Sequence, residues 1–86
     1  MRQPATKTNI ADLWGRKVAE RRSYMGISQA QLAELCDVTQ QTISKIEAGR
    51  MIPHDRLKLV LANRMAIEPG ELFAWPPRSD LVERAA

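Results

Sequence analysis

The residues with the richest hydrogen-bonding chemistry lie in the stretch VTQQTISKIEAGR, residues 38–50. If this stretch is helical, its polar face carries Gln40, Gln41, Ser44, Lys45 and Ala48. That face holds amides, a hydroxyl and a cation, with no acid and no large apolar group. Such groups match the base edges in the major groove of B-DNA, where glutamine pairs with N6 and N7 of adenine. Adjacent glutamines also occur as neutral helix formers on a solvated surface, so the pair alone does not show whether this face binds DNA.

Two short helices joined by a tight turn would position this face. Ser28 followed by Gln31 is a capping-box pattern, which predicts a helix over about 28–36. Asp37 tolerates the left-handed backbone that a sharp turn requires. A second helix then follows over about 39–48, with isoleucines on its inner face. The pair predicts a helix-turn-helix, with the second helix as the recognition helix.

Apolar residues at helical spacing predict three more helices around this pair. The first runs from about Asn9 to Gly26, the fourth covers about 54–66, and a short fifth covers about 69–74. No repeat, strand alternation or low-complexity segment is present. The predicted fold is therefore all-α, with five helices in one domain over residues 9–75. Residues 1–8 are expected to form a flexible basic arm and residues 76–86 a tail, with either a short helix from Asp80 or a loose end.

Composition limits the possible function classes. The 86 residues suit one small domain, and 44% hydrophobic with 27% charged residues is typical of a globular chain. No apolar run is long enough for a membrane span or a secretory signal, so we expect a cytoplasmic protein with no membrane partner. One cysteine and one histidine leave no disulfide, metal or cofactor site to expect. Cys36 is expected to be a small buried hydrophobe, with a redox-sensing thiol as the alternative.

Charge is unevenly distributed along the chain. Residues 1–27 carry six basic and two acidic residues, and residues 49–66 carry four basic and one acidic. Residues 28–48 and 67–86 each have a net charge of −2. Two basic blocks flanking residues 38–50 suit a polyanion lying across them, but a slightly basic solvated surface would show the same pattern.

The stretch GISQAQLAELCDVTQQTISKIEAGRMIP, residues 26–53, closely resembles the helix-turn-helix of the lambda-repressor and Cro type, also called the XRE family. The resemblance is carried by SQ.QLAE, by V...TISKIE.G and by the proline that follows, and extends more weakly from Val18 to Leu72. It implies a lambda-repressor-like bundle of five helices that binds double-stranded DNA at an operator, usually as a dimer.

The resemblance also implies roles for individual residues. It assigns base contacts to Gln40, Gln41, Ser44 and Lys45. It assigns contacts with the DNA backbone to Gln29, Thr39 and Arg50. It assigns a structural ion pair between the first and third helices to Arg22 and Glu47.

Two further groups of side chains raise alternatives. His54, Asp55 and Arg56 lack a nucleophile for acid–base catalysis, so we expect His54 at a helix N-terminus that contacts phosphate, with Asp55 as the cap. Phe73 and Trp75 fit either the edge of the core or a dimer interface, and we favour the dimer interface.

The sequence therefore predicts a DNA-binding transcriptional regulator without enzymatic activity. The favoured form is a small phage- or mobile-element-type repressor that binds a pseudo-palindromic operator as a homodimer. The alternative is an antitoxin or adaptor whose main role is to bind a protein partner, with autoregulatory DNA binding.

Overall fold

The computed structural model describes residues 9–76, which form five α-helices. These are α1 (Ile10–Tyr24), α2 (Gln29–Cys36), α3 (Gln40–Glu47), α4 (Asp55–Arg64) and α5 (Pro69–Leu72). The prediction of an all-α fold with five helices is confirmed. The predicted arm, residues 1–8, and residues 77–86 of the predicted tail lie outside the described residues. None of the helices in residues 9–76 is both long and apolar enough to cross a membrane.

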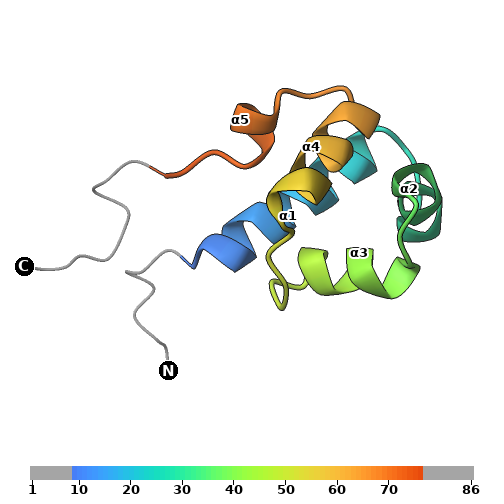
Figure 1. The fold of residues 1–86 in the computed structure, drawn as a ribbon, viewed down its shortest axis with the longest axis horizontal. Helices are drawn as coiled ribbons and strands as arrows, with labels where there is room; N and C mark the ends of the chain where they lie inside the picture. Colours follow the sequence, from blue (N-terminus) through green and yellow to red (C-terminus); the bar gives the residue numbers. More distant parts are fainter. Residues whose placement is uncertain (1–8, 77–86) are drawn as a thin grey trace, which may run out of the picture.

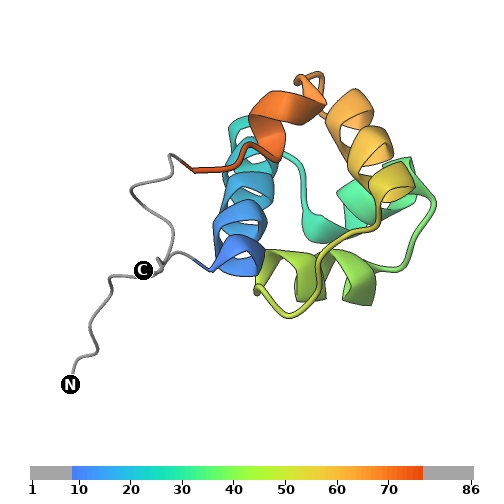
Figure 2. The same ribbon diagram turned by 60° about the vertical axis from the view of Figure 1, so that its left-hand side comes forward.

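The helices pack as a small bundle, and Figure 2 shows α1 and α4 on opposite sides of it. In both views α3 lies at one end of the bundle and α5 at the other (Figures 1 and 2). All five helices contribute to one hydrophobic core. Its fully buried members include Val18, Leu32, Ile43, Ile46, Leu61, Met65 and Leu72. Burying side chains of this kind stabilises the fold by about 1.5–3 kcal/mol each, before the loss of chain entropy.

The ends of α1 and α2 follow from local chemistry. The side chain of Asn9 accepts hydrogen bonds from the N–H groups of Ala11 and Asp12, at 2.9 and 3.3 Å, and so caps the start of α1. Gly26 takes a φ of 72° just after this helix, a left-handed conformation that glycine adopts at little cost. The predicted capping box at the start of α2 is also formed.

The last helix is shorter than the predicted range of 69–74. It ends at Leu72 because Phe73 leaves the helical conformation, with φ −113° and ψ 41°. The chain then turns back along α1, where the indole N–H of Trp14 donates a hydrogen bond of 2.9 Å to the carbonyl of Ala74. This contact between residues far apart in the sequence replaces further helical turns.

Gly15 is the point at which α1 approaches the end of α3 most closely. A Cβ atom at this position would lie 2.2 Å from the carbonyl oxygen of Ile46 and 2.9 Å from that of Glu47. Both neighbours are backbone atoms, so they cannot move aside as a flexible side chain would. The absence of a side chain at Gly15 therefore fixes how close the recognition helix lies to the rest of the bundle.

We predict that Gly15→Ala lowers the free energy of unfolding by about 1–3 kcal/mol, because the added methyl group forces α1 and α3 apart. Urea denaturation followed by circular dichroism measures this change. Gly70→Ala is the matched control, since a Cβ at that helical position meets nothing within 4 Å. It should be neutral or stabilising by up to about 1 kcal/mol. Equal stability of the two variants would contradict the close approach.

Candidate nucleic-acid interface

The outer face of α3 is built by a tight turn and a buried back. The turn from α2 passes through Asp37, which has a φ of 59° and a ψ of 42°, as its ability to adopt a left-handed backbone predicted. The hydroxyl of Thr39 then accepts a hydrogen bond of 3.1 Å from the N–H of Thr42 and caps α3. Ile43 and Ile46 are fully buried behind the helix. The four predicted base-contacting residues, Gln40, Gln41, Ser44 and Lys45, are all exposed to solvent.

The start of α2 lies beside the end of α3, where Gln29 contacts Glu47, and can hold an anion. In the capping box, the N–H of Ser28 donates to the side chain of Gln31 at 2.8 Å, and the N–H of Gln31 donates to Ser28 Oγ at 3.0 Å. The intervening N–H groups, on Gln29 and Ala30, have no acceptor within the helix because they belong to its first turn. Together with the positive end of the helix dipole, they can bind a phosphate oxygen.

Arg22 and Glu47 form the expected ion pair between α1 and α3. Arg22 Nε and Nη2 donate to the two carboxylate oxygens of Glu47, at 2.7 and 3.0 Å. The remaining Nη1 donates to the carbonyl of Ile27 at 2.9 Å, just before α2 begins. The hydrogen bond to Glu47 raises the pKa of Arg22, against the opposing effect of burial. The guanidinium therefore stays charged and joins three segments of the chain.

Glu47 has a third donor that the sequence did not predict. Gln29 Nε2 donates a hydrogen bond of 2.9 Å to Glu47 Oε1, the same oxygen that accepts from Arg22 Nη2. The amide of Gln29, expected to contact the DNA backbone, is thus already held by the ion pair.

Arg50 directly follows the recognition helix. Gly49 takes a φ of 77° to end α3, and the N–H of Arg50 donates a hydrogen bond of 2.9 Å to the carbonyl of Lys45. This closes the C-terminus of α3 and leaves the side chain of Arg50 exposed. A cation in this position is suited to pair with a phosphate of a DNA duplex lying along α3.

The predicted cap of α4 is wrong by one residue. His54, rather than Asp55, is the N-cap, because His54 Nδ1 accepts a hydrogen bond of 3.2 Å from the N–H of Leu57. The side chain of Asp55 is fully exposed and lies 3.7 Å from Lys58 Nζ. An imidazole that accepts at Nδ1 keeps its hydrogen on Nε2, which leaves one donor of His54 for a phosphate.

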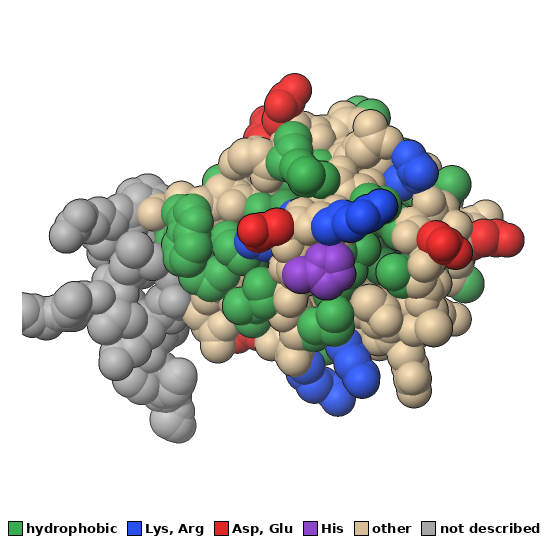
Figure 3. All heavy atoms as spheres, viewed as in Figure 1, with side chains coloured by type: hydrophobic (Ala, Val, Ile, Leu, Met, Phe, Trp, Pro, Cys, Tyr) green, Lys and Arg blue, Asp and Glu red, His purple; other side chains and the backbone are tan. Residues whose placement is uncertain are grey.

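Of the two residues predicted for a dimer interface, Phe73 is buried and Trp75 is exposed. Phe73 is 7% exposed and packs edge-on against Trp14, with ring centroids 5.6 Å apart, so it belongs to the core. Trp75 is 66% exposed although it also meets Trp14 edge-on, at 5.3 Å. Lys58 Nζ lies 4.3 Å from the centroid of the Trp14 ring, and these residues border a cavity of about 310 Å³. Figure 3 shows hydrophobic side chains at the surface on this face of the molecule.

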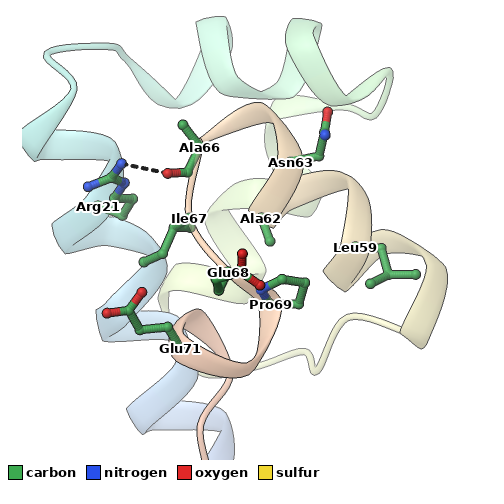
Figure 4. Close-up of a pocket in the computed structure, with 9 residues that line it drawn as sticks. All are labelled: Arg21, Leu59, Ala62, Asn63, Ala66, Ile67, Glu68, Pro69 and Glu71. Atoms are coloured by element: carbon green, nitrogen blue, oxygen red, sulfur yellow. Dashed lines mark hydrogen bonds between the residues drawn. The ribbon is translucent and has the colours of Figure 1, made fainter.

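A groove of about 730 Å³ lies beside α4 and α5 (Figure 4). Arg21 closes one end by donating to the carbonyls of Met65 and Ala66, at 2.8 and 3.0 Å. No local pattern in the sequence predicts these bonds, which join residues more than forty positions apart. The groove runs along α5, on the side of the bundle away from α3, so it is not part of the candidate interface. No cluster of potential metal ligands occurs within residues 9–76.

Comparison with known proteins agrees with this geometry. The sequence profile of a family described as "Helix-turn-helix" matches residues 19–72. An uncharacterized HTH-type transcriptional regulator of Methanothermobacter thermautotrophicus is 43% identical over 49 residues, which cover 57% of this chain and 65% of the relative. Another from Bacillus subtilis, YgzD, is 35% identical over 57 residues, covering 66% of this chain and 86% of the relative.

Two solved structures share the fold. The restriction-modification controller protein C.AhdI from Aeromonas hydrophila superposes with a TM-score of 0.70 at 31% sequence identity, over 72% of this chain and 94% of that one. The clp gene regulator ClgR from C. glutamicum gives a TM-score of 0.76 over 84% of this chain and 90% of that one. Its 18% identity makes it evidence for the fold alone.

Cys36, the last residue of α2, is buried in the core. Burial raises the pKa of its thiol, and the positive charge of Arg64 opposes this increase. We predict that a disulfide reagent such as Ellman's reagent modifies the folded protein at pH 8 much more slowly than the urea-unfolded chain. The thiolate is the reactive form, so a raised pKa lowers its fraction at that pH, and the rate should increase as the pH rises. Equal rates in the folded and unfolded chains would instead support a redox-sensing thiol.

Proposed function

The chain belongs to the XRE-type helix-turn-helix family of DNA-binding transcriptional regulators, and from this membership we propose that it is a small repressor of the phage or mobile-element type. It binds a pseudo-palindromic operator as a homodimer and represses by occupying DNA that RNA polymerase needs. The observation that carries this proposal is the outer face of α3. It is exposed, free of acidic groups and fixed from behind by two buried isoleucines.

In the proposed complex α3 enters the major groove with its N-terminal end toward the bases. Gln40 and Gln41 pair with base edges, with adenine as the preferred partner of a glutamine amide. Ser44 and Lys45 lie further along the groove, and Lys45 can reach guanine O6 and N7 or a phosphate.

The remaining contacts grip the sugar–phosphate backbone on both sides of α3. Gln29 and the first turn of α2 bind one phosphate, and Thr39 lies at the edge of the groove. Arg50 and His54 bind phosphates beyond the end of α3. Contacts of this kind set the position of the protein and the salt dependence of its affinity, whereas the base contacts determine the preferred sequence.

Dimerisation is proposed to involve the side of the bundle that carries Trp75. Both recognition helices of a dimer must face the same side of the DNA, about one helical turn apart, so the second protomer lies beside the first. The segment after α5 runs along the side of the bundle rather than over α3 (Figures 1 and 2). The exposed indole of Trp75 and the adjoining 310 Å³ cavity give that side an apolar surface for a second copy.

Selection of bound sequences from a random pool of DNA duplexes tests the proposal. Recovery of a two-fold-symmetric site, with half-sites about one helical turn apart, is the expected result. Enrichment of nothing above background would overturn it. Co-purification of a stoichiometric protein partner, together with that negative result, would favour the antitoxin or adaptor hypothesis.

Two variants, measured on the selected duplex, should distinguish contacts with bases from contacts with the DNA backbone. We predict that Gln40→Ala weakens binding by about 1–3 kcal/mol and relaxes the preference at one base pair of each half-site. Arg50→Ala should weaken binding to all sequences alike and reduce the slope of log affinity against log salt by about one for each protomer. An unchanged base preference in Gln40→Ala would contradict the proposed register of α3.

We predict that Trp75→Ser shifts the protein from dimer toward monomer in sedimentation velocity, because it removes the exposed apolar anchor. Tyr24→Ser is the control. Tyr24 is also an exposed aromatic residue, but it lies about 15 Å further along α1 than Trp14, which contacts Trp75. It should leave the oligomeric state unchanged. A dimer that withstands Trp75→Ser would place the interface elsewhere.

A further inference from the structure

We propose that Glu47 is a positioning residue for DNA binding, in addition to its part in the ion pair with Arg22. Its carboxylate holds the amide of Gln29 in one orientation, so that the second N–H of that amide is ready for a phosphate at the start of α2. This inference rests on the proposed function, since it concerns how one of the proposed backbone contacts is prepared.

The carboxylate of Glu47 accepts three hydrogen bonds that reach it from two other helices. Oε2 accepts from Arg22 Nε at 2.7 Å, and Oε1 accepts from Arg22 Nη2 at 3.0 Å and from Gln29 Nε2 at 2.9 Å. The side chain of Glu47 is only 7% exposed, so these protein donors take the place of water. Arg22 balances the charge of the carboxylate from α1, and Oε1 still accepts the bond from Gln29 directly.

This contact determines which way round the amide of Gln29 lies. A carboxylate only accepts hydrogen bonds, so the amide nitrogen must face Glu47 and the amide oxygen must turn away. Nε2 carries two hydrogens, and Glu47 uses one of them. The second N–H stays free to donate to an acceptor outside the protein, and a phosphate oxygen is such an acceptor.

Gln29 occupies the position where this orientation matters. It is the first residue of α2, and its first-turn backbone N–H groups and helix dipole favour an anion at the same place. A free glutamine side chain would have to give up rotamer freedom on binding, whereas an anchored one has already done so. The acid that anchors it adds little repulsion to DNA because Arg22 pairs with its charge.

A double-mutant cycle on the selected duplex tests the inference. Gln29→Ala should lower the affinity roughly tenfold in the wild-type background, the size expected for one hydrogen bond to a charged group. In the Glu47→Ala background, where residue 47 offers the amide of Gln29 no acceptor, Gln29→Ala should lower the affinity less than about twofold. All variants are compared at a temperature at which circular dichroism shows them to be folded.

Arg22→Lys is the matched control for a purely structural role. It weakens the same ion pair but leaves Glu47 Oε1 available to Gln29, so Gln29→Ala should still cost roughly tenfold in this background. If Gln29→Ala lowers the affinity by the same factor in the wild-type protein and in both variants, the inference is overturned and the proposed function is left intact. A loss of the Gln29 effect in Arg22→Lys as well as in Glu47→Ala would also overturn it, since general loosening of the helices would then explain both losses. Failure to select any duplex is a different result, which rejects the proposed function itself.

Discussion

The hydrogen-bonded ion pair of Arg22 and Glu47 is the interaction on which the arrangement of α1, α2 and α3 depends. One guanidinium reaches α3 through Glu47 and the approach to α2 through the carbonyl of Ile27. The planar group presents its donors in a fixed fork, so it sets directions as well as distances between these segments. The side chain of Arg22 is 20% exposed and that of Glu47 is 7% exposed. Removing either partner would therefore leave a largely buried charge unpaired, which destabilises the fold.

Close contacts at two glycines also hold α1 against the end of α3. Gly15 brings α1 against the carbonyls at the end of α3, and Gly49 packs closely against Asp12 one turn earlier on α1. The inner side of α3 is therefore fixed at its end by backbone and along its length by buried isoleucines. Its outer side makes no comparable packing contacts, so the residues that we propose to meet DNA can differ in sequence without disturbing the fold.

Features with a local cause were predictable from the sequence, and features with a distant cause were not. The capping box at Ser28, the left-handed turn at Asp37 and the ends of α3 depend on residues within a few positions of one another. The cap of α4 was misplaced because His54 and Asp55 are adjacent and both can accept the bond. Phe73 was misassigned to the surface because its burial depends on Trp14, far along the chain. The bond from Gln29 to Glu47 spans 18 residues and left no pattern in the sequence.

The charge of the interface shows the same dependence on three-dimensional contacts. Counted along the chain, residues 28–48 are net acidic, which argues against DNA binding by the segment that holds the recognition helix. In the folded chain, Glu47 is buried against Arg22 and contributes little charge to the outer face of α3. The exposed cations Lys45 and Arg50 and the positive ends of α2 and α3 then dominate that face. The proposed electrostatic fit to a phosphate backbone therefore depends in part on the pairing of Glu47 with Arg22, which a count of charges along the sequence conceals.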